Sequence, residues 1–362
     1  MATVEPTSAT ATSACAGAQA STFGRLYRSG EDFSTRWPIV YSSVYNIGFL
    51  GMEKLHPFDS KKWGRVFAMI QEEKMISGEE DIVTPVEAHE DDLRQIHTNA
   101  YLSSLSWSAN VARITEIAPV AIVPNFIVNR VVLKPLRFQT GGTVLAGRLA
   151  MEHGWSINIG GGFHHCSGEE GGGFCAYADI SLCIKALQEN YFADDENKNI
   201  LIVDLDAHQG NGHENDVRTG RISHVTIMDM YNSSIYPRDR LAAKVINEER
   251  RLEMYTEDDT YLRLLRRSIA CVLDADPPPR ALIYNAGTDV LEGDQLGRLA
   301  ITDQGIIDRD EIVFRAATER RIPIVMVTSG GYQQRTAGVI ARSLINLWQK
   351  KLINRSIASK TV

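Results

Sequence analysis

Residues 200–208 read Ile-Leu-Ile-Val-Asp-Leu-Asp-Ala-His, an apolar run that ends in alternating acidic and imidazole side chains. A short, continuous run of Ile, Leu and Val is typical of a strand that is buried on both faces of a parallel sheet. Residues two apart on an extended segment point to the same side, so Asp204, Asp206 and His208 would share one face. The stretch therefore predicts a buried strand with a polar cluster at its carboxyl end.

Similar apolar runs recur along the chain and alternate with longer amphipathic segments. Strands are expected at Ser156 to Ile159, Ile200 to Leu205, His224 to Met228, Ala281 to Tyr284 and Ile322 to Val327. Helices are expected at Lys61 to Lys74, Tyr177 to Glu189, Glu257 to Val272 behind a Thr256 cap, and Asp308 to Glu319. Strands that alternate with helices predict an α/β fold, with a largely parallel sheet flanked by helices on both faces.

Chemically reactive residues follow four of these strands. The segments are Gly-Gly-Gly-Phe-His-His at 160–165, Asp-Leu-Asp-Ala-His at 204–208, Asn-Ala-Gly-Thr-Asp at 285–289 and Thr-Ser-Gly-Gly-Tyr at 328–332. Open α/β sheets bind their ligands outside the carboxyl ends of the strands. We therefore expect His, Asp and Tyr side chains from distant parts of the chain to meet at one edge of the sheet.

Asp206, His208 and Asp289 form a candidate metal site, with one nitrogen and two oxygen ligands. Three protein ligands with one position open for water are typical of catalytic zinc, whereas structural zinc is usually closed by four. Taken alone, Asp-x-Asp-x-His is equally compatible with a loop in which carboxylates cap backbone N–H groups. The addition of Asp289 and of a histidine pair favours a metal site and, with it, a hydrolytic reaction.

Two adjacent histidines, His164 and His165, follow three glycines that allow the backbone to pass close to a bound group. Imidazole is well suited to proton transfer near neutral pH, so we expect the pair to act in proton transfer.

Tyr332 either donates a hydrogen bond to a developing oxyanion or belongs to a plain strand-to-helix turn. The other histidines are interpreted as surface or packing residues: His56, His89, His97, His153, His213 and His224.

The composition is that of an ordinary globular protein, with 362 residues of which 44% are hydrophobic and 23% charged. No apolar run approaches the roughly 20 residues that a membrane-spanning helix needs. The net charge of −7 argues against a protein whose main function is to bind the phosphate backbone of nucleic acids. The cysteines are an odd number without zinc-finger spacing and are expected to be reduced intracellular thiols: Cys15, Cys166, Cys175, Cys183 and Cys271.

Two tails flank one expected domain. Residues 1–34 begin with a stretch rich in Ser, Thr and Ala, which predicts a disordered tail. Arg25 and Arg28 beside this acid-poor stretch are also compatible with an organelle transit peptide. Residues 35–350 contain no linker or repeat and read as a single domain, and residues 351–362 read as a C-terminal tail.

The ordered motifs resemble those of the metal-dependent histone deacetylases. The resemblance rests on residues 160–166, 204–213, 285–289 and 328–332, and it runs from about Arg36 to about Leu347. Four flanking phrases resemble the class IV branch of that family: Arg-Trp-Pro-Ile-Val-Tyr at 36–41, Leu-His-Pro-Phe-Asp at 55–59, Gln-Thr-Gly-Gly-Thr at 139–143 and Gly-Gly-Phe-Cys at 172–175.

This resemblance implies an arginase/deacetylase-like fold and hydrolysis of N-acyl-lysine amides. It implies Zn²⁺ as the cofactor, held by Asp206, His208 and Asp289, although this ligand set also tolerates Fe²⁺. The catalytic residues that it implies are His164, His165, Tyr332, Asp204 and Asn211, and the residues that it implies for the acyl-lysine channel are Gly173, Phe174 and Tyr236.

The resemblance also suggests how these residues act. His165 accepts a proton from water, while His164, held by Asp204, stabilises the charged intermediate or passes a proton to the leaving amine; the sequence leaves open which histidine is the base. Tyr332 helps to bind the substrate carbonyl. Asn211 stands where some relatives carry Asp, and a neutral amide would favour a neutral His165.

The implied partners are acylated lysine side chains of histones or other proteins, together with corepressor or chromatin proteins. Neither direct nucleic-acid binding nor a membrane is expected. The implied location is the nucleus or the cytoplasm, with a plastid or mitochondrion as the alternative if the tail is a transit peptide. Removal of acetyl groups and removal of long fatty-acyl chains both stay open.

Three alternatives compete with this interpretation. A binuclear manganese ureohydrolase would need carboxylates at 210 and 291, where this chain has Gly210 and Leu291, so one metal is expected. A small-molecule deacetylase, such as an acetylpolyamine amidohydrolase, is less well matched by the class IV phrases. A catalytically silent chromatin scaffold is disfavoured because every catalytic position is filled.

Overall fold

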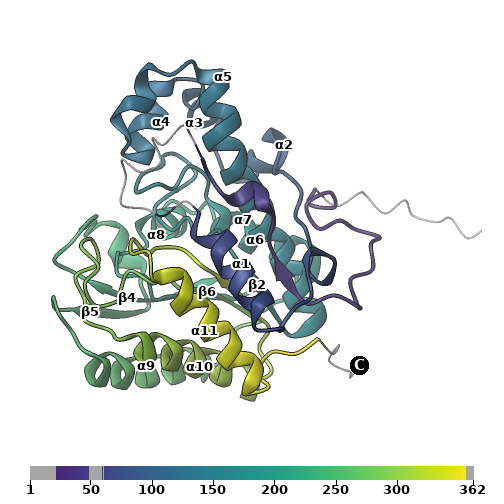
Figure 1. The fold of residues 1–362 in the computed structure, drawn as a ribbon, viewed down its shortest axis with the longest axis vertical. Helices are drawn as coiled ribbons and strands as arrows, with labels where there is room; N and C mark the ends of the chain where they lie inside the picture. Colours follow the sequence, from purple (N-terminus) through teal and green to yellow (C-terminus); the bar gives the residue numbers. More distant parts are fainter. Residues whose placement is uncertain (1–21, 49–58, 60, 356–362) are drawn as a thin grey trace, which may run out of the picture.

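The computed structural model describes residues 22–48, 59 and 61–355. Within these residues, seven parallel strands form one sheet in the order β1-β2-β7-β6-β3-β4-β5 (Figure 1). The strands are β1 (Ile39–Val40), β2 (Trp155–Asn158), β3 (Ile200–Asp204), β4 (Val225–Asn232), β5 (Glu248–Leu252), β6 (Ala281–Asn285) and β7 (Ile324–Val327). The predicted α/β fold with a parallel sheet is confirmed.

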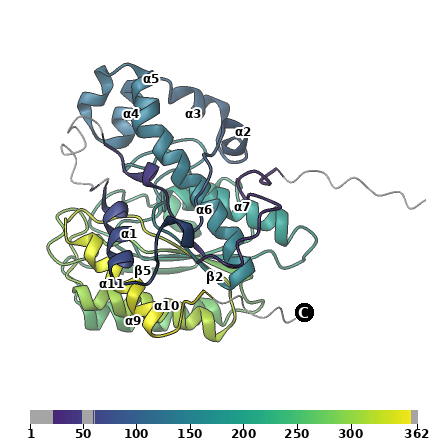
Figure 2. The ribbon, with the colours of Figure 1, turned by 45° about the vertical axis from the view of Figure 1, so that its right-hand side comes forward.

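Helices cover both faces of the sheet. In both views α9, α10 and α11 lie along one face, while α6 and α7 cover the other and the short helices α3, α4 and α5 extend beyond them (Figures 1 and 2). The helices are α1 (Lys62–Glu72), α2 (Glu90–Leu93), α3 (Asn99–Ser104), α4 (Ser108–Thr115), α5 (Asn125–Val128), α6 (Lys134–His153), α7 (Asp179–Tyr191), α8 (Asn211–Arg218), α9 (Asp258–Leu273), α10 (Asp303–Glu319) and α11 (Thr336–Gln349). None of the described helices combines the length and apolar character needed to cross a bilayer.

The central strands are buried throughout because helices pack on both sides of them. Every residue of β2, β3, β6 and β7 is buried. These four strands are also neighbours, in the order β2-β7-β6-β3. Their carboxyl ends are in register, since Asn158 pairs with Val327, Val327 with Asn285, and Asn285 with Asp204. The four segments singled out in the sequence therefore start at the same level, at the centre of one sheet edge.

The prediction lacked two strands, β1 and β5, and seven helices: α2, α3, α4, α5, α6, α8 and α11. Strand β1 has only two residues, and β5 reads Glu-Glu-Arg-Arg-Leu, an edge strand without the apolar run of a buried one. Helix α6 contains adjacent glycines, which lower helix propensity. Tertiary packing explains Gly141, because a Cβ there would lie 2.1 Å from the Val86 carbonyl oxygen.

The predicted boundaries need correction at several points. Residues 22–34 are part of the folded domain, because Phe23, Leu26 and Phe33 are buried in the core. The C-terminal boundary also lies later than 350, since Ile353 is buried. The remainder of both predicted tails, residues 1–21 and 356–362, lies outside the described residues, as do residues 49–58 and 60.

Two helix starts also differ. The Thr256 hydroxyl donates to the Glu253 carbonyl (2.8 Å) and does not cap α9, whose N-cap residue is Glu257. Helix α10 begins at Asp303, five residues before the predicted start, and the Thr302 hydroxyl accepts a hydrogen bond from the Gly305 N–H.

Candidate active site

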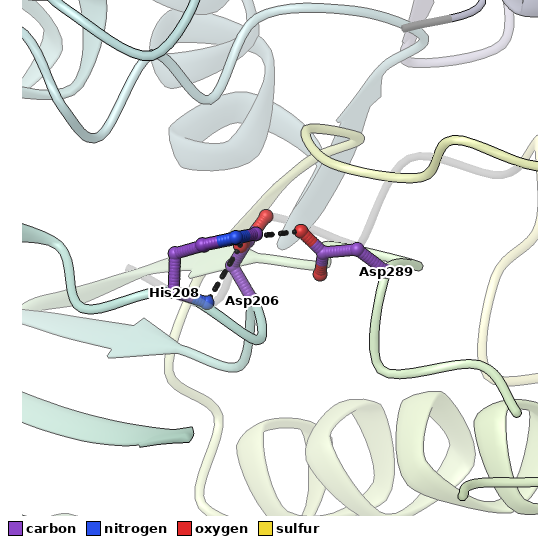
Figure 3. A group of neighbouring side chains, drawn as sticks. All are labelled: Asp206, His208 and Asp289. Carbon is purple, nitrogen blue, oxygen red and sulfur yellow. Dashed lines mark hydrogen bonds and ion pairs between the residues drawn. The ribbon is translucent and has the colours of Figure 1, made fainter. Parts of the chain in front are cut away.

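Asp206, His208 and Asp289 converge beyond the ends of β3 and β6 (Figure 3). His208 Nδ1 lies 3.1 Å from Asp206 Oδ1 and 2.9 Å from Asp289 Oδ2. One ligand atom from each residue lies within 4.8 Å of the others, and all three side chains are buried. Among the described residues this is the one group of three or more ligating side chains that meets such a spacing.

Neighbouring groups hold the carboxylates in place. Asp289 Oδ1 accepts a hydrogen bond from the Ala207 N–H (2.8 Å). Asp206 Oδ2 accepts hydrogen bonds from the Ser329 hydroxyl (2.9 Å) and the Gly330 N–H (3.1 Å). Only glycine fits at position 330, because a Cβ would lie 2.3 Å from Asp289 Oδ2 and 2.5 Å from Asp206 Oδ2. The second oxygen of each carboxylate is thus left to face His208.

The electrostatics of this group suit a cation. Burial and the neighbouring Asp206 carboxylate raise the pKa of Asp289 to about 7. Burial lowers the pKa of His208, but hydrogen bonds to Asp206 and Asp289 and their charges outweigh it and raise that pKa to about 10. The two buried carboxylates favour the protonated form of the imidazole between them, because positive charge at this place stabilises both carboxylates. One nitrogen and two oxygen donors fit Zn²⁺ or Fe²⁺.

The tandem histidines lie beside the triad, with ring centroids 4.0 Å apart. His164 Nδ1 is 3.0 Å from Asp204 Oδ2, and His165 Nδ1 is 2.8 Å from Asn211 Oδ1. Burial lowers the pKa of His164, but the Asp204 and Asp206 carboxylates raise it to about 9. Burial and the neighbouring His164 and His208 hold the pKa of His165 well below its usual range. One ring therefore favours the charged form and the other the neutral form.

A narrow pocket leads to these groups and has a volume of about 30 Å³. Gly173 and Phe174 line it, together with Tyr332 and with Trp63 from α1. Tyr236 stands at the rim, 47% exposed, with its ring 4.9 Å from that of His165. The structure thus brings the predicted site residues together, whereas their roles stay predictions.

Lys62 is a component of the site that the sequence analysis missed. Its side chain is buried, and its Nζ donates to the Gly330 carbonyl (2.7 Å) and to the Ser329 carbonyl. Burial lowers the pKa of Lys62 to about 8, against the opposing effect of Asp289 and Asp206. Lys62 therefore fixes the backbone that leads to Tyr332. A lysine at the start of an amphipathic helix gives no sequence signal of such burial.

Asp179, on the first turn of α7, holds the loop that carries the histidines. Its carboxylate accepts hydrogen bonds from the Gly162 N–H (2.8 Å), the Phe163 N–H (2.8 Å) and the Thr143 hydroxyl (2.6 Å). All three contacts are buried. The loop residues 160–162 also have positive φ angles of 153°, 70° and 76°, a conformation that glycine adopts readily.

Asp179→Ala is expected to lower the free energy of unfolding by about 3 kcal/mol, because buried N–H donors lose their acceptor. Urea denaturation followed by circular dichroism measures this change. Asp179→Asn keeps one acceptor oxygen and should lose less than the alanine variant. An unchanged unfolding midpoint for Asp179→Ala would contradict this account of the loop.

Known proteins resemble the chain in both sequence and fold. Residues 56–348 match the model of the histone deacetylase domain. The chain is 53% identical over 315 residues to histone deacetylase 2 of Arabidopsis thaliana, covering 87% of this chain and 79% of that protein. It is 28% identical over 294 residues to the acetoin utilization protein AcuC of Staphylococcus aureus, covering 76% and 72%. A solved structure of the HDA15 HD domain superposes with a TM-score of 0.68 at 15% identity, covering 90% and 91%.

These findings indicate a hydrolase of the deacetylase type. The chain belongs to the histone deacetylase family. The fold is accordingly the arginase/deacetylase-like α/β fold that the sequence motifs implied.

Proposed function

We propose that this protein is a zinc-dependent hydrolase of N-acyl-lysine amides and belongs to the class IV branch of its family. One arrangement of side chains carries the proposal. Three candidate metal ligands and two histidines lie along one narrow pocket, and one of these histidines favours its charged form whereas the other favours its neutral form. The class IV assignment is supported by the phrases at 36–41, 139–143 and 172–175.

Asp206, His208 and Asp289 would hold the metal ion. A divalent cation at this position supplies Lewis acidity toward the amide carbonyl and toward water. The side chains around it account for the proton transfers and for substrate binding. In the overall reaction the amide C–N bond breaks, a C–O bond to water forms, and the products are a carboxylic acid and the lysine amine.

His165 acts as the base in this proposal. Asn211 Oδ1 accepts the hydrogen bond of His165 Nδ1, so the neutral ring carries its proton on Nδ1 and offers Nε2 to a proton from water. His164 acts as the acid, because Asp204 holds its Nδ1–H and favours the charged ring, whose Nε2–H can pass a proton to the leaving amine. The Tyr332 hydroxyl donates to the carbonyl oxygen as negative charge develops on it.

The acyl-lysine side chain would pass along Gly173 and Phe174, with Tyr236 at the entrance. Hydrolysis rates on one peptide carrying acetyl, butyryl, octanoyl or myristoyl lysine test this assignment. We expect cleavage of at least one acyl-lysine, with the rate depending on chain length. Absence of cleavage across the series by protein with a full complement of metal would contradict the proposed function.

Asn211→Asp is expected to move the acid limb of the kcat/KM profile upward by about one pH unit or more. The base must be neutral to act, so activity falls as pH drops through its pKa. A carboxylate in place of Asn211 Oδ1 raises the pKa of His165, and the loss then begins at higher pH. A pH–rate profile from pH 5 to 9 measures the shift.

Asn215→Asp is the matched control, since Asn215 lies on the same helix and bonds Asp239 (3.0 Å) instead of a site histidine. Its acid limb should stay in place. If the acid limb of the kcat/KM profile of Asn211→Asp stayed at the wild-type pH, His165 would not be the base.

A small-molecule amide is the second candidate substrate, supported by the similarity to the acetoin utilization protein AcuC. Free acetylated polyamines and the acetyl-lysine peptide can be compared in the same assay. A kcat/KM higher for the polyamine than for every peptide would favour this second candidate.

The proposed protein partners are acylated histones or other acylated proteins, with corepressor or chromatin proteins as further partners. We propose the nucleus or the cytoplasm as the location. A plastid or mitochondrial location would depend on residues 1–21, which lie outside the described structure.

A further inference from the structure

A second imidazole contacts the carboxylate that holds His164. His213, on the first turn of α8, places Nε2 2.9 Å from Asp204 Oδ2, the same oxygen atom that lies 3.0 Å from His164 Nδ1. A ring nitrogen facing a carboxylate at this distance must carry a proton, because two lone pairs would repel. Asp204 Oδ2 therefore accepts one N–H from each histidine.

The other oxygen of Asp204 is held equally firmly. Oδ1 accepts hydrogen bonds from Asn285 Nδ2 (2.9 Å) and from the Asp206 N–H (3.1 Å). Four donors from four different parts of the chain thus surround one fully buried carboxylate. Loss of the His213 donor would leave Oδ2 with His164 as its one partner among the described residues, so the hydrogen bond between Asp204 and His164 would be less well fixed.

Local structure keeps the position between His213 and Asp204 free of other atoms. A Cβ on residue 210 would lie 2.1 Å from His213 Nε2 and 2.6 Å from Asp204 Oδ2, so only glycine permits this contact. Gly210 is in turn fixed by its N–H, which donates to Asp229 Oδ2 (2.9 Å). The turn that starts α8 is therefore shaped around the hydrogen bond between His213 and Asp204.

Packing alone does not account for an imidazole at this position. His213 is 1% exposed, and its Nδ1 has no hydrogen-bond partner among the described residues. An aliphatic side chain would fill the space without burying an unsatisfied nitrogen, which is unfavourable. The polar contact that distinguishes His213 from such a side chain is its bond to Asp204.

We propose that His213 is a positioning residue that fixes the Asp204 carboxylate and, through it, the orientation and tautomer of His164. The inference rests on the proposed function, since His164 is the proposed acid. His213 itself does not line the pocket. Its removal should therefore affect the chemical step and leave substrate binding largely intact.

His213→Leu is expected to lower kcat by about 10- to 100-fold, the size of effect that outer-shell residues of metal sites have, and to leave KM within about threefold. His213→Gln presents an amide N–H near the position of Nε2 and should recover most of the loss. His153→Leu is the matched control, because His153 is also buried with an unpartnered Nδ1 but lies at the end of α6, and its kcat should not change.

Nuclear magnetic resonance of protein labelled with ¹⁵N-histidine gives a readout that does not depend on activity. The Nδ1–H proton of His164 should resonate far downfield in the wild-type protein and in His213→Gln, and should shift or broaden in His213→Leu. Thermal unfolding and metal content should be measured on every variant.

Recovery by glutamine, with a preserved His164 signal, would support the proposal. Equal loss of kcat in both variants, or an unchanged His164 signal in His213→Leu, would overturn it. The wild-type rate on acyl-lysine peptides tests the proposed function separately, and the resonance test of His213 holds whatever that rate is.

Discussion

Asp289→Asn is expected to lower kcat/KM on an acyl-lysine peptide by about 10³-fold or more and to release the bound metal. Asparagine has the same shape but removes one of two carboxylate charges around His208, whose Nδ1 lies 2.9 Å from Asp289 Oδ2. Loss of a charged ligand weakens the hold on the cation, and several kcal/mol of barrier lowering depend on that cation. Peptide hydrolysis and elemental analysis of the same preparation measure both effects.

The Asp289→Asn protein should remain folded. Burial and Asp206 raise the pKa of Asp289, so the ionised carboxylate is disfavoured there when no cation balances it, and a neutral amide removes this cost. Asp81→Asn is a matched control, because Asp81 is buried but bonds Ser77 and Arg355, remote from the triad. Retention of metal and of wild-type activity by Asp289→Asn would exclude Asp289 as a ligand.

Tyr332→Phe is expected to lower kcat by about 10²- to 10³-fold while the metal content stays at the wild-type level. Tyr332 lines the pocket, its ring centroid lies 6.3 Å from that of His208, and its N–H donates to Asp294 Oδ2 (3.1 Å). Phenylalanine keeps the ring and the backbone bond but removes the hydroxyl donor. Steady-state kinetics together with elemental analysis separate the loss of a donor from the loss of metal.

Tyr231→Phe provides the corresponding control. The Tyr231 hydroxyl donates to Glu249 Oε1 (2.6 Å) between two strands at the sheet edge, so its removal should leave kcat unchanged. If Tyr332→Phe retained full turnover, Tyr332 would belong to a structural turn, the alternative that the sequence left open.

The central part of the fold was predictable because its strands are buried on both faces. A strand of that kind needs an unbroken apolar run, and β3 and β6 carry one. Polar residues directly after such runs must lie at the carboxyl edge of the sheet, which is why Asp206 and Asp289 could be placed together although 83 positions separate them.

The parts that were missed have no such pattern. Strand β5 is charged because it lies at the sheet edge, and among the described strands it pairs only with β4. Lys62 and His213 act through buried contacts with residues far along the chain or across a turn, and neither contact follows from the neighbouring sequence. Phe23 and Phe33 were assigned to a tail because residues before them are rich in Ser and Ala, whereas their aromatic side chains complete the core.

The proposed chemistry requires one cation bound between Asp206, His208 and Asp289. Crystals of the protein prepared with zinc, measured on both sides of the zinc absorption edge, test it directly. We expect one anomalous peak at about 2.0–2.2 Å from His208 Nδ1 and from an oxygen of each carboxylate. A peak away from these three atoms, or a second strong peak in the pocket, would contradict it.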